Sequence, residues 1–198
     1  MKPLFTLLLL SNSFVALSQG KIEFGAIRSD SNFKANHRTS YVDSINFGIR
    51  NISYSNNELE IRLTTFCLPH AGNDIIILTY NNGTWDARKF LFEHSHYYPT
   101  TGVTYIQTYP SNKTIIDNYF EGAFDTLKQN KTFLLPDMRE LKFERAIHDG
   151  VGFSLTFKVK DQFREYFFDN PGQYAKMNPD IPEFKQFDRI VKEIRSLF

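Results

Sequence analysis

The chain has 198 residues and nearly balanced charge, with 23 Lys and Arg residues against 22 Asp and Glu residues. This balance argues against a nucleic-acid binder and against a polybasic membrane-surface protein, since both need an excess of Lys and Arg. The only cysteine, Cys67, excludes an intramolecular disulfide, and a chain of this length buries enough surface to fold without one.

Residues 1–18 have the pattern of a cleaved signal peptide. Lys2 precedes the apolar run 4–10, and the small residues Ala16 and Ser18 form a small-x-small cleavage site. We expect cleavage after Ser18, and the apolar stretch is too short to span a membrane. The remaining 180 residues, with 22 basic and 22 acidic side chains, would form one secreted or periplasmic domain. Export without a disulfide favours a bacterial source.

The first half of the chain predicts β-strands. Leu59, Ile61 and Leu63 alternate with charged residues, which is typical of a strand with one wet face. Asn82-Gly83 is a strong signal for a tight hairpin. Strands are expected at residues 21–27, 44–52, 58–63, 74–80, 84–93 and 103–108.

Helical spacing begins near Ser111. The apolar residues of this predicted helix are Ile116, Tyr119 or Phe120, Ala123 and Leu127. Residues 132–136 should then be extended. Residues 136–148 allow either a strand or a helical turn.

The last 47 residues predict a hairpin followed by helices. Strands are expected at 152–160 and 163–168, joined by a turn at 161–162. Asn170-Pro171 predicts a short helix capped by Asn170, and Asp180 is the expected cap of a longer one that has Pro182 in its first turn. The longer helix has a core-facing apolar stripe, formed by Phe184, Phe187, Ile190, Val191, Ile194 and Leu197.

Strands come first and helices cluster late, which indicates an α+β fold. The short connections are too short for parallel crossovers. We therefore predict a mainly antiparallel sheet of hairpins, with a mid-chain helix and C-terminal helices packed on it.

Two histidines suggest a metal site. On a strand, His94 and His96 point to the same side, as two imidazole ligands of one metal ion would. The third ligand stays open, and the candidates are His70, Glu93, Asp86, His148 and Cys67. The alternative is a solvated strand end. The pair Cys67 and His70 also allows a Cys/His nucleophile, although the apolar residues around Cys67 favour a buried strand-end thiol.

Aromatic residues suggest a recognition surface. Trp85 follows a hairpin turn, and Tyr97, Tyr98 and Tyr105 lie in the stretch that follows. Such side chains give contact area to sugars or proteins at low entropic cost. The alternative is that they cover the edge of the sheet.

Several short patterns resemble the C-terminal part of uncharacterised secreted or periplasmic bacterial proteins. They are Leu134-Leu-Pro-Asp137, Asp149-Gly150, Arg164-Glu-Tyr166 and Asn170-Pro171, within about the last third of the chain. The resemblance implies bacterial export and carries no activity.

The sequence has no Gly-x-Ser-x-Gly, phosphate-binding Gly loop, His-Glu-x-x-His or Cys-x-x-Cys pattern, so no catalytic residue and no cofactor are assigned. The leading hypothesis is a non-enzymatic exported binding or envelope-accessory protein with a protein or glycan partner. The rival is a metal-dependent hydrolase using His94 and His96.

Overall fold

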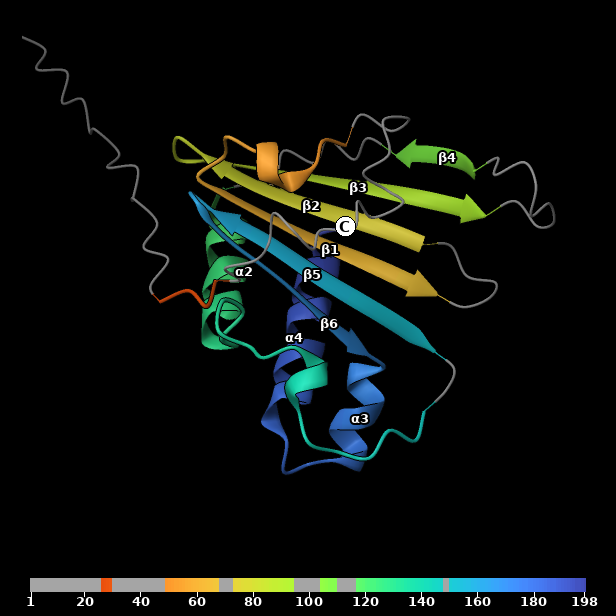
Figure 1. The fold of residues 1–198 in the computed structure, drawn as a ribbon. Helices are drawn as coiled ribbons and strands as arrows, with labels where there is room; N and C mark the ends of the chain where they lie inside the picture. The colour runs from red at the N-terminus through yellow and green to blue at the C-terminus, as the bar shows by residue number, and fades with distance from the viewer. Residues whose placement is uncertain (1–25, 30–48, 68–72, 95–103, 110–116, 148–149) are drawn as a thin grey trace, which may run out of the picture.

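The computed structural model describes residues 26–29, 49–67, 73–94, 104–109, 117–147 and 150–198. In these residues an antiparallel sheet has the strand order β4-β3-β2-β1-β5-β6 (Figure 1). The strands are β1 (Leu59–Cys67), β2 (Asn73–Asn81), β3 (Thr84–His94), β4 (Thr104–Tyr109), β5 (Val151–Val159) and β6 (Gln162–Asp169). The helices are α2 (Asp117–Gln129), α3 (Pro171–Met177) and α4 (Pro182–Ser196), with 3-10 turns η2 (Ile52–Tyr54) and η3 (Met138–Glu140). The predicted α+β fold, with one mid-chain and two C-terminal helices, is confirmed.

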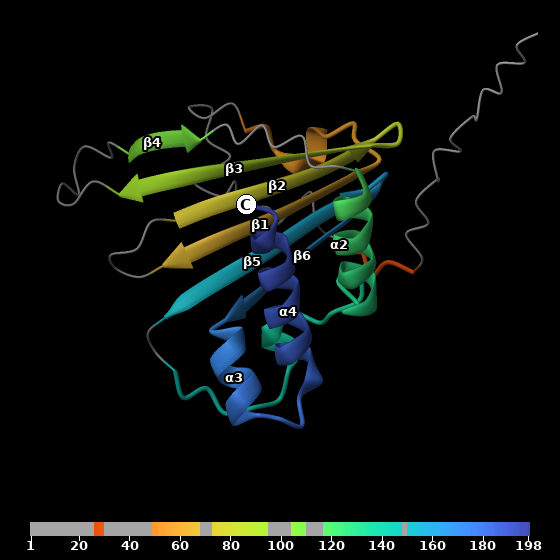
Figure 2. The ribbon, with the colours of Figure 1, turned by 180° about the vertical axis from the view of Figure 1, so that it is seen from behind.

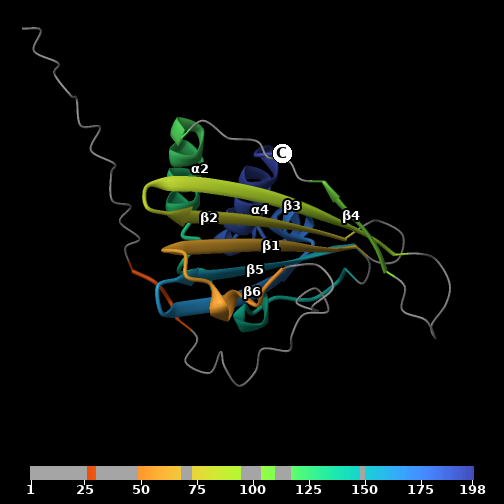
Figure 3. The ribbon, with the colours of Figure 1, turned by 90° about the horizontal axis from the view of Figure 1, so that it is seen from above.

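The sheet separates two layers of different character. Seen from behind, α2 and α4 lie across one face of the sheet, and α3 lies beside α4 (Figure 2). The view from above places η2 on the opposite face (Figure 3). We call these the helix face and the outer face.

Strand β1 lies inside the sheet between β2 and β5, which explains its complete burial on the helix face. Leu59, Ile61 and Leu63 are each 0% exposed. Their cross-strand neighbours are apolar on both sides, as with Leu78 and Phe157 opposite Ile61. The alternate residues of β1 turn to the outer face and include Glu60 and Arg62, so one strand supplies both the core and a charged surface.

Helix α4 packs its apolar stripe on the sheet as predicted. Every residue of that stripe is buried, and Phe184, Phe187, Ile190 and Ile194 are 0% exposed. Phe187 stacks on Phe168 of β6 with ring centroids 4.3 Å apart. The aromatic residues of the C-terminal segment are therefore core contacts.

Two tight turns fix the strand register. Asn82 and Gly83 both have positive φ, 49° and 80°, as a type I′ hairpin requires. This confirms the predicted β2–β3 hairpin. The β5–β6 turn is centred on Lys160, which has φ 53°, and Asp161, one residue earlier than predicted.

The segment 132–140 covers the outer edge of β6. The Asp137 carboxylate accepts hydrogen bonds from the Phe167 N–H at 3.0 Å and from the Arg139 backbone and side chain. Burial alone raises the pKa of Asp137, but these hydrogen bonds outweigh it and hold the pKa below its ordinary value. An edge strand with unpaired N–H groups promotes aggregation, and here Asp137 satisfies one of them.

Residues 136–148, for which the sequence allows either a strand or a helical turn, begin with a capped 3-10 turn. Asp137 and Glu140 form a capping box around η3. Leu141 then has extended backbone, and no strand follows within the described residues 141–147. Glu140 also forms an ion pair with Arg28.

Neither predicted cap residue makes a side-chain cap hydrogen bond. Asn170 is the N-cap residue of α3 ahead of Pro171, as predicted, but its backbone is left-handed and its side chain does not bond to the helix. Instead its Oδ1 accepts a hydrogen bond from Val151 N at 3.0 Å, joining α3 to the start of β5. Helix α4 begins at Pro182 after Ile181, without a side-chain cap, so Asp180 does not have the predicted role.

The N-terminal strand predictions are tested only at their ends. Residues 26–29 are not in a strand, although Arg28 N donates to Phe133 O at 2.9 Å. The predicted strand 44–52 is wrong where it is described, because Ile49 and Arg50 are irregular and Ile52 begins η2. The remainder of both segments lies outside the described residues.

Helix α2 buries the predicted Phe120, Ala123 and Leu127.

Candidate functional site

A groove on the outer face is the strongest candidate site. It has a volume of about 360 Å³, within the range of small-molecule sites, and lies between strands β1 to β3 and the segment 49–57. The strand register arranges its floor in two rows. Glu60, Thr79 and Asp86 are aligned across β1, β2 and β3, and so are Arg62, Ile77 and Arg88.

In the first row an acidic residue lies on each side of β2, and in the second row an arginine lies on each side. One acid–arginine pair therefore lies on β1 and another on β3. On β1, Arg62 Nε donates to Glu60 Oε1 at 2.7 Å. On β3, Arg88 Nε donates to Asp86 Oδ2 at 2.9 Å. Residues two apart on a strand share a face, so the spacing acid-x-Arg is what builds each pair.

The pair on β1 is a buried part of the framework. Glu60 is 5% exposed and Arg62 is 9% exposed. The Arg62 Nη2 group also donates to the carbonyl of Arg50 at 2.6 Å, and Asn57 Nδ2 donates to Glu60 Oε2 at 3.1 Å. A buried ion pair needs such additional hydrogen bonds to offset its desolvation. This network anchors the segment 49–57 to the sheet.

The segment 49–57 is also held from the β5 side. Lys158 Nζ donates to the backbone carbonyls of Ser53 at 3.0 Å and Ser55 at 2.5 Å. Asn51 caps η2 by accepting from Ser53 N at 2.9 Å. The groove wall is therefore fixed before any ligand arrives.

The pair on β3 and the rim are open to solvent. The side chains of Arg88 and Asp86 are 67% and 50% exposed. Tyr54 follows on the rim with 75% of its surface exposed, the highest value among the exposed large hydrophobic residues. A Tyr side chain has an apolar ring and a polar hydroxyl, which is why Tyr is enriched at interfaces.

One part of the groove is apolar. Ile49, Ile75 and Ile77 form a small buried cluster on the outer face, and Phe90 packs against it. Ile49, Ile77 and Phe90 line the groove. The groove thus combines an apolar patch, planar hydrogen-bonding groups and an exposed aromatic ring.

These groups suit a polyhydroxylated ligand. A sugar hydroxyl both donates and accepts, so it can bridge a guanidinium and a carboxylate that lie side by side. The C–H face of a sugar ring is apolar and packs on an aromatic ring. Asn51, Asn56 and Asn57 add amide donors and acceptors along the same wall.

The predicted recognition surface is not assembled in the described part of the chain. Trp85 is 8% exposed and stacks on Phe120 of α2 with ring centroids 5.3 Å apart, so it is a core residue. Its Nε1 has no hydrogen-bond partner among the described residues. Tyr105 lies on the edge strand β4, while Tyr97 and Tyr98 lie outside the described residues.

The predicted metal site is tested only in part. His94 is the last residue of β3, and His96, like His70 and His148, lies outside the described residues. Asp86 is eight residues from His94 on the same strand, about 27 Å away at ~3.4 Å per residue, so it cannot share a metal ion with it. Within the described residues, no group of three or more His, Cys, Asp and Glu side chains could hold a metal ion.

Of the other suggested ligands, Cys67 and Glu93 lie at the same end of the sheet. Cys67 ends β1, and the register through β2 sets Thr65, two residues before Cys67, level with Leu91, two residues before Glu93 on β3. Strands β1 and β3 are two strand spacings apart, about 10 Å. The Cys67–His70 nucleophile stays a prediction, because His70 is outside the described residues.

The groove was not identified from the sequence, because finding it needs both the residue spacing on each strand and the order of the strands in the sheet. Glu60-x-Arg62 and Asp86-x-Arg88 are readable as matching pairs on two strands. Only the strand order places them on either side of β2. The exposure of Tyr54 follows from η2, where the sequence predicts the end of a strand.

Comparison with protein-family models gives no match, and the search of curated proteins gives none either. Among the described residues, no helix combines the length and apolar character needed to cross a membrane.

Proposed function

We propose that this chain is an exported, non-enzymatic binding or envelope-accessory protein whose groove takes a glycan. The observation that carries the proposal is the groove itself. It presents the exposed Asp86–Arg88 pair beside a wall anchored by the buried Glu60–Arg62 pair, with Tyr54 open on its rim. The signal-peptide pattern of residues 1–18 supports export.

The two ion pairs of the groove differ in exposure, and this difference supports a binding role. The buried pair on β1 has its hydrogen-bonding groups engaged by Arg50 and Asn57, so it holds the wall in place. The exposed pair on β3 is free to exchange water for ligand hydroxyls. A preformed site of this kind loses little entropy on binding.

A glycan array probed with residues 19–198 tests the proposal, followed by calorimetric titration of the best oligosaccharide. We expect Tyr54→Ala and Arg88→Ala each to weaken binding about tenfold or more, because each removes a principal contact. Arg189→Ala is the matched control, since Arg189 is exposed on α4 and does not line the groove.

Two results would overturn the proposal. One is an array on which no glycan is retained, with a protein partner captured instead through a different surface. The other is release of cleaved sugar during the titration, since turnover contradicts a non-enzymatic role.

The alternative is a metal-dependent hydrolase using His94 and His96. Elemental analysis of protein purified without chelator separates the two. A stoichiometric metal that is lost in His96→Ala supports the hydrolase, and metal-free protein that still binds glycan supports the binding protein.

A further inference from the structure

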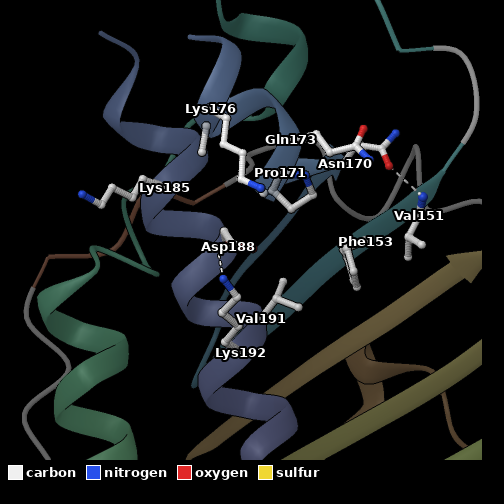
Figure 4. Close-up of a pocket in the computed structure, with 12 residues that line it drawn as sticks. Val151, Phe153, Asn170, Pro171, Gln173, Lys176, Lys185, Asp188, Val191 and Lys192 are labelled. Atoms are coloured by element: carbon white, nitrogen blue, oxygen red, sulfur yellow. Dashed lines mark hydrogen bonds and ion pairs between the residues drawn. The ribbon is translucent and has the colours of Figure 1, made fainter. Parts of the chain in front are cut away.

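A second hollow lies on the opposite side of the molecule from the groove. It has a volume of about 490 Å³ and lies between α3, α4 and the start of β5 (Figure 4). Its residues come from three separate elements, so it exists only in the folded chain.

The walls of this hollow are held by specific backbone contacts. Asn170 and Val151 are joined twice, through Asn170 Oδ1 to Val151 N at 3.0 Å and Asn170 N to Val151 O at 2.9 Å. At Gly172, a Cβ atom would lie only 2.9 Å from Asp188 Oδ1. Glycine therefore allows α3 to approach α4 closely at this point.

The floor of the hollow is apolar. Val151 and Phe153 come from β5, Pro171 and Ala175 from α3, and Val191 from α4. Figure 4 shows the side chains of Phe153 and Val191 directed into the space between the strand and α4. Phe153 and Val191 are 8% and 5% exposed, so an acyl chain lying there would cover mainly the partly exposed Val151 and Ala175.

The rim of the hollow is basic. Lys176, Lys185 and Lys192 line it against one carboxylate, Asp188. Lys192 Nζ is 2.6 Å from Asp188 Oδ2. Lys176 and Lys185 form no ion pair within the described part of the chain, and Figure 4 shows the Lys176 ammonium turned back toward Pro171 and Lys185 turned away. In a chain of nearly balanced charge this is a local cationic excess.

We propose that the hollow binds a small anionic amphiphile, a carboxylate on a medium-length acyl chain. The acyl chain lies on the apolar floor and the carboxylate lies beside Lys176 and Lys192. Charge complementarity selects the anion, and the apolar floor selects the chain. The site does not depend on the groove, which is on the outer face of the sheet.

Calorimetric titration with decanoate tests this proposal, with decanol and acetate as partial probes. We expect decanoate to bind more tightly than either, because decanol lacks the charge and acetate lacks the chain. Lys176→Gln should weaken decanoate binding about two- to fivefold, which is the size of one exposed charge contact. Lys192→Gln should weaken it more, because it also leaves Asp188 unpaired. Lys142→Gln is the control, since Lys142 is exposed outside the hollow.

A variant that fills the hollow with a larger apolar side chain tests the proposal without changing any charge. Ala175→Leu adds volume to the floor and should abolish decanoate binding while the thermal unfolding midpoint and the glycan affinity of the groove stay unchanged. No binding of decanoate, equal affinity for decanol, or unchanged binding in both Lys176→Gln and Ala175→Leu would overturn the proposal.

Discussion

The two acid–arginine pairs of the outer face predict opposite outcomes for the same substitution. Arg62 and Arg88 each pair with an acidic residue two positions earlier on a strand, but Arg62 is 9% exposed and the Arg88 side chain is 67% exposed. Arg62→Ala leaves Glu60 buried without its guanidinium partner. Arg88→Ala leaves Asp86 in water.

The expected costs follow from this difference in burial. Breaking a buried pair by removing one partner costs about 3–5 kcal/mol, so Arg62→Ala should lower the free energy of unfolding by that amount. An exposed pair contributes about 0–1 kcal/mol, so Arg88→Ala should lower it by less than about 1 kcal/mol. Urea unfolding of both variants measures this, with an unchanged dependence on urea concentration as evidence that only stability has changed.

A double variant separates loss of the pair from loss of packing. Replacing Glu60 and Arg62 together by Met removes both charges and keeps apolar volume, so it should recover most of the stability lost in Arg62→Ala. A cost below about 1 kcal/mol for Arg62→Ala, or a cost for Arg88→Ala as large as that for Arg62→Ala, would refute the reasoning.

Three further substitutions test the fold. Asp137→Asn should lower the free energy of unfolding by about 1–2 kcal/mol at pH 7. Since the pKa of Asp137 lies below its ordinary value in the folded protein, its contribution is present above about pH 4 and is lost as the pH falls. The deficit of Asp137→Asn, measured by urea unfolding from pH 7 to pH 3, should therefore shrink on acidification, and a constant deficit would contradict this. Phe187→Ala removes a fully buried ring stacked on Phe168 and should cost about 3–5 kcal/mol in the same assay, whereas a cost under 1 kcal/mol would place that ring outside the core. Gly152→Ala sets a Cβ atom 2.7 Å from the Phe167 ring and should cost about 1–3 kcal/mol, with partial recovery on adding Phe167→Ala; no cost would mean that the ring moves aside freely.

Local pattern was sufficient for elements whose neighbours lie close in sequence. The alternation at Leu59, Ile61 and Leu63, the Asn82-Gly83 turn and the stripe of α4 each predicted the observed structure. In each case the signal is either the spacing of apolar residues along one element or the residue type that a tight turn requires. Neither depends on contacts with distant parts of the chain.

Contacts between distant segments could not be read from the sequence. Asn170 precedes a proline at a helix start, which predicts a cap, yet its side chain bonds to Val151 of the neighbouring strand. Trp85 follows a turn, which suggests exposure, yet α2 brings Phe120 over its ring. Both outcomes depend on tertiary packing that overrides a local preference.

The groove could not be predicted for the same reason. Its floor needs β1 to lie beside β2 and β3 in a fixed register, and its wall needs η2 to lie over them. Glu60, Arg62, Asp86 and Arg88 are ordinary strand residues in the sequence. Only their alignment gives them a common surface.

The most direct test of the glycan proposal is the affinity of residues 19–198 for an oligosaccharide selected on an array, compared with Tyr54→Ala. Tyr54 is 75% exposed, so its removal should leave the thermal midpoint unchanged. We predict that the wild-type chain retains at least one glycan and that Tyr54→Ala loses about tenfold or more in affinity. Equal affinity of the two proteins for every glycan retained would contradict the assignment of the groove.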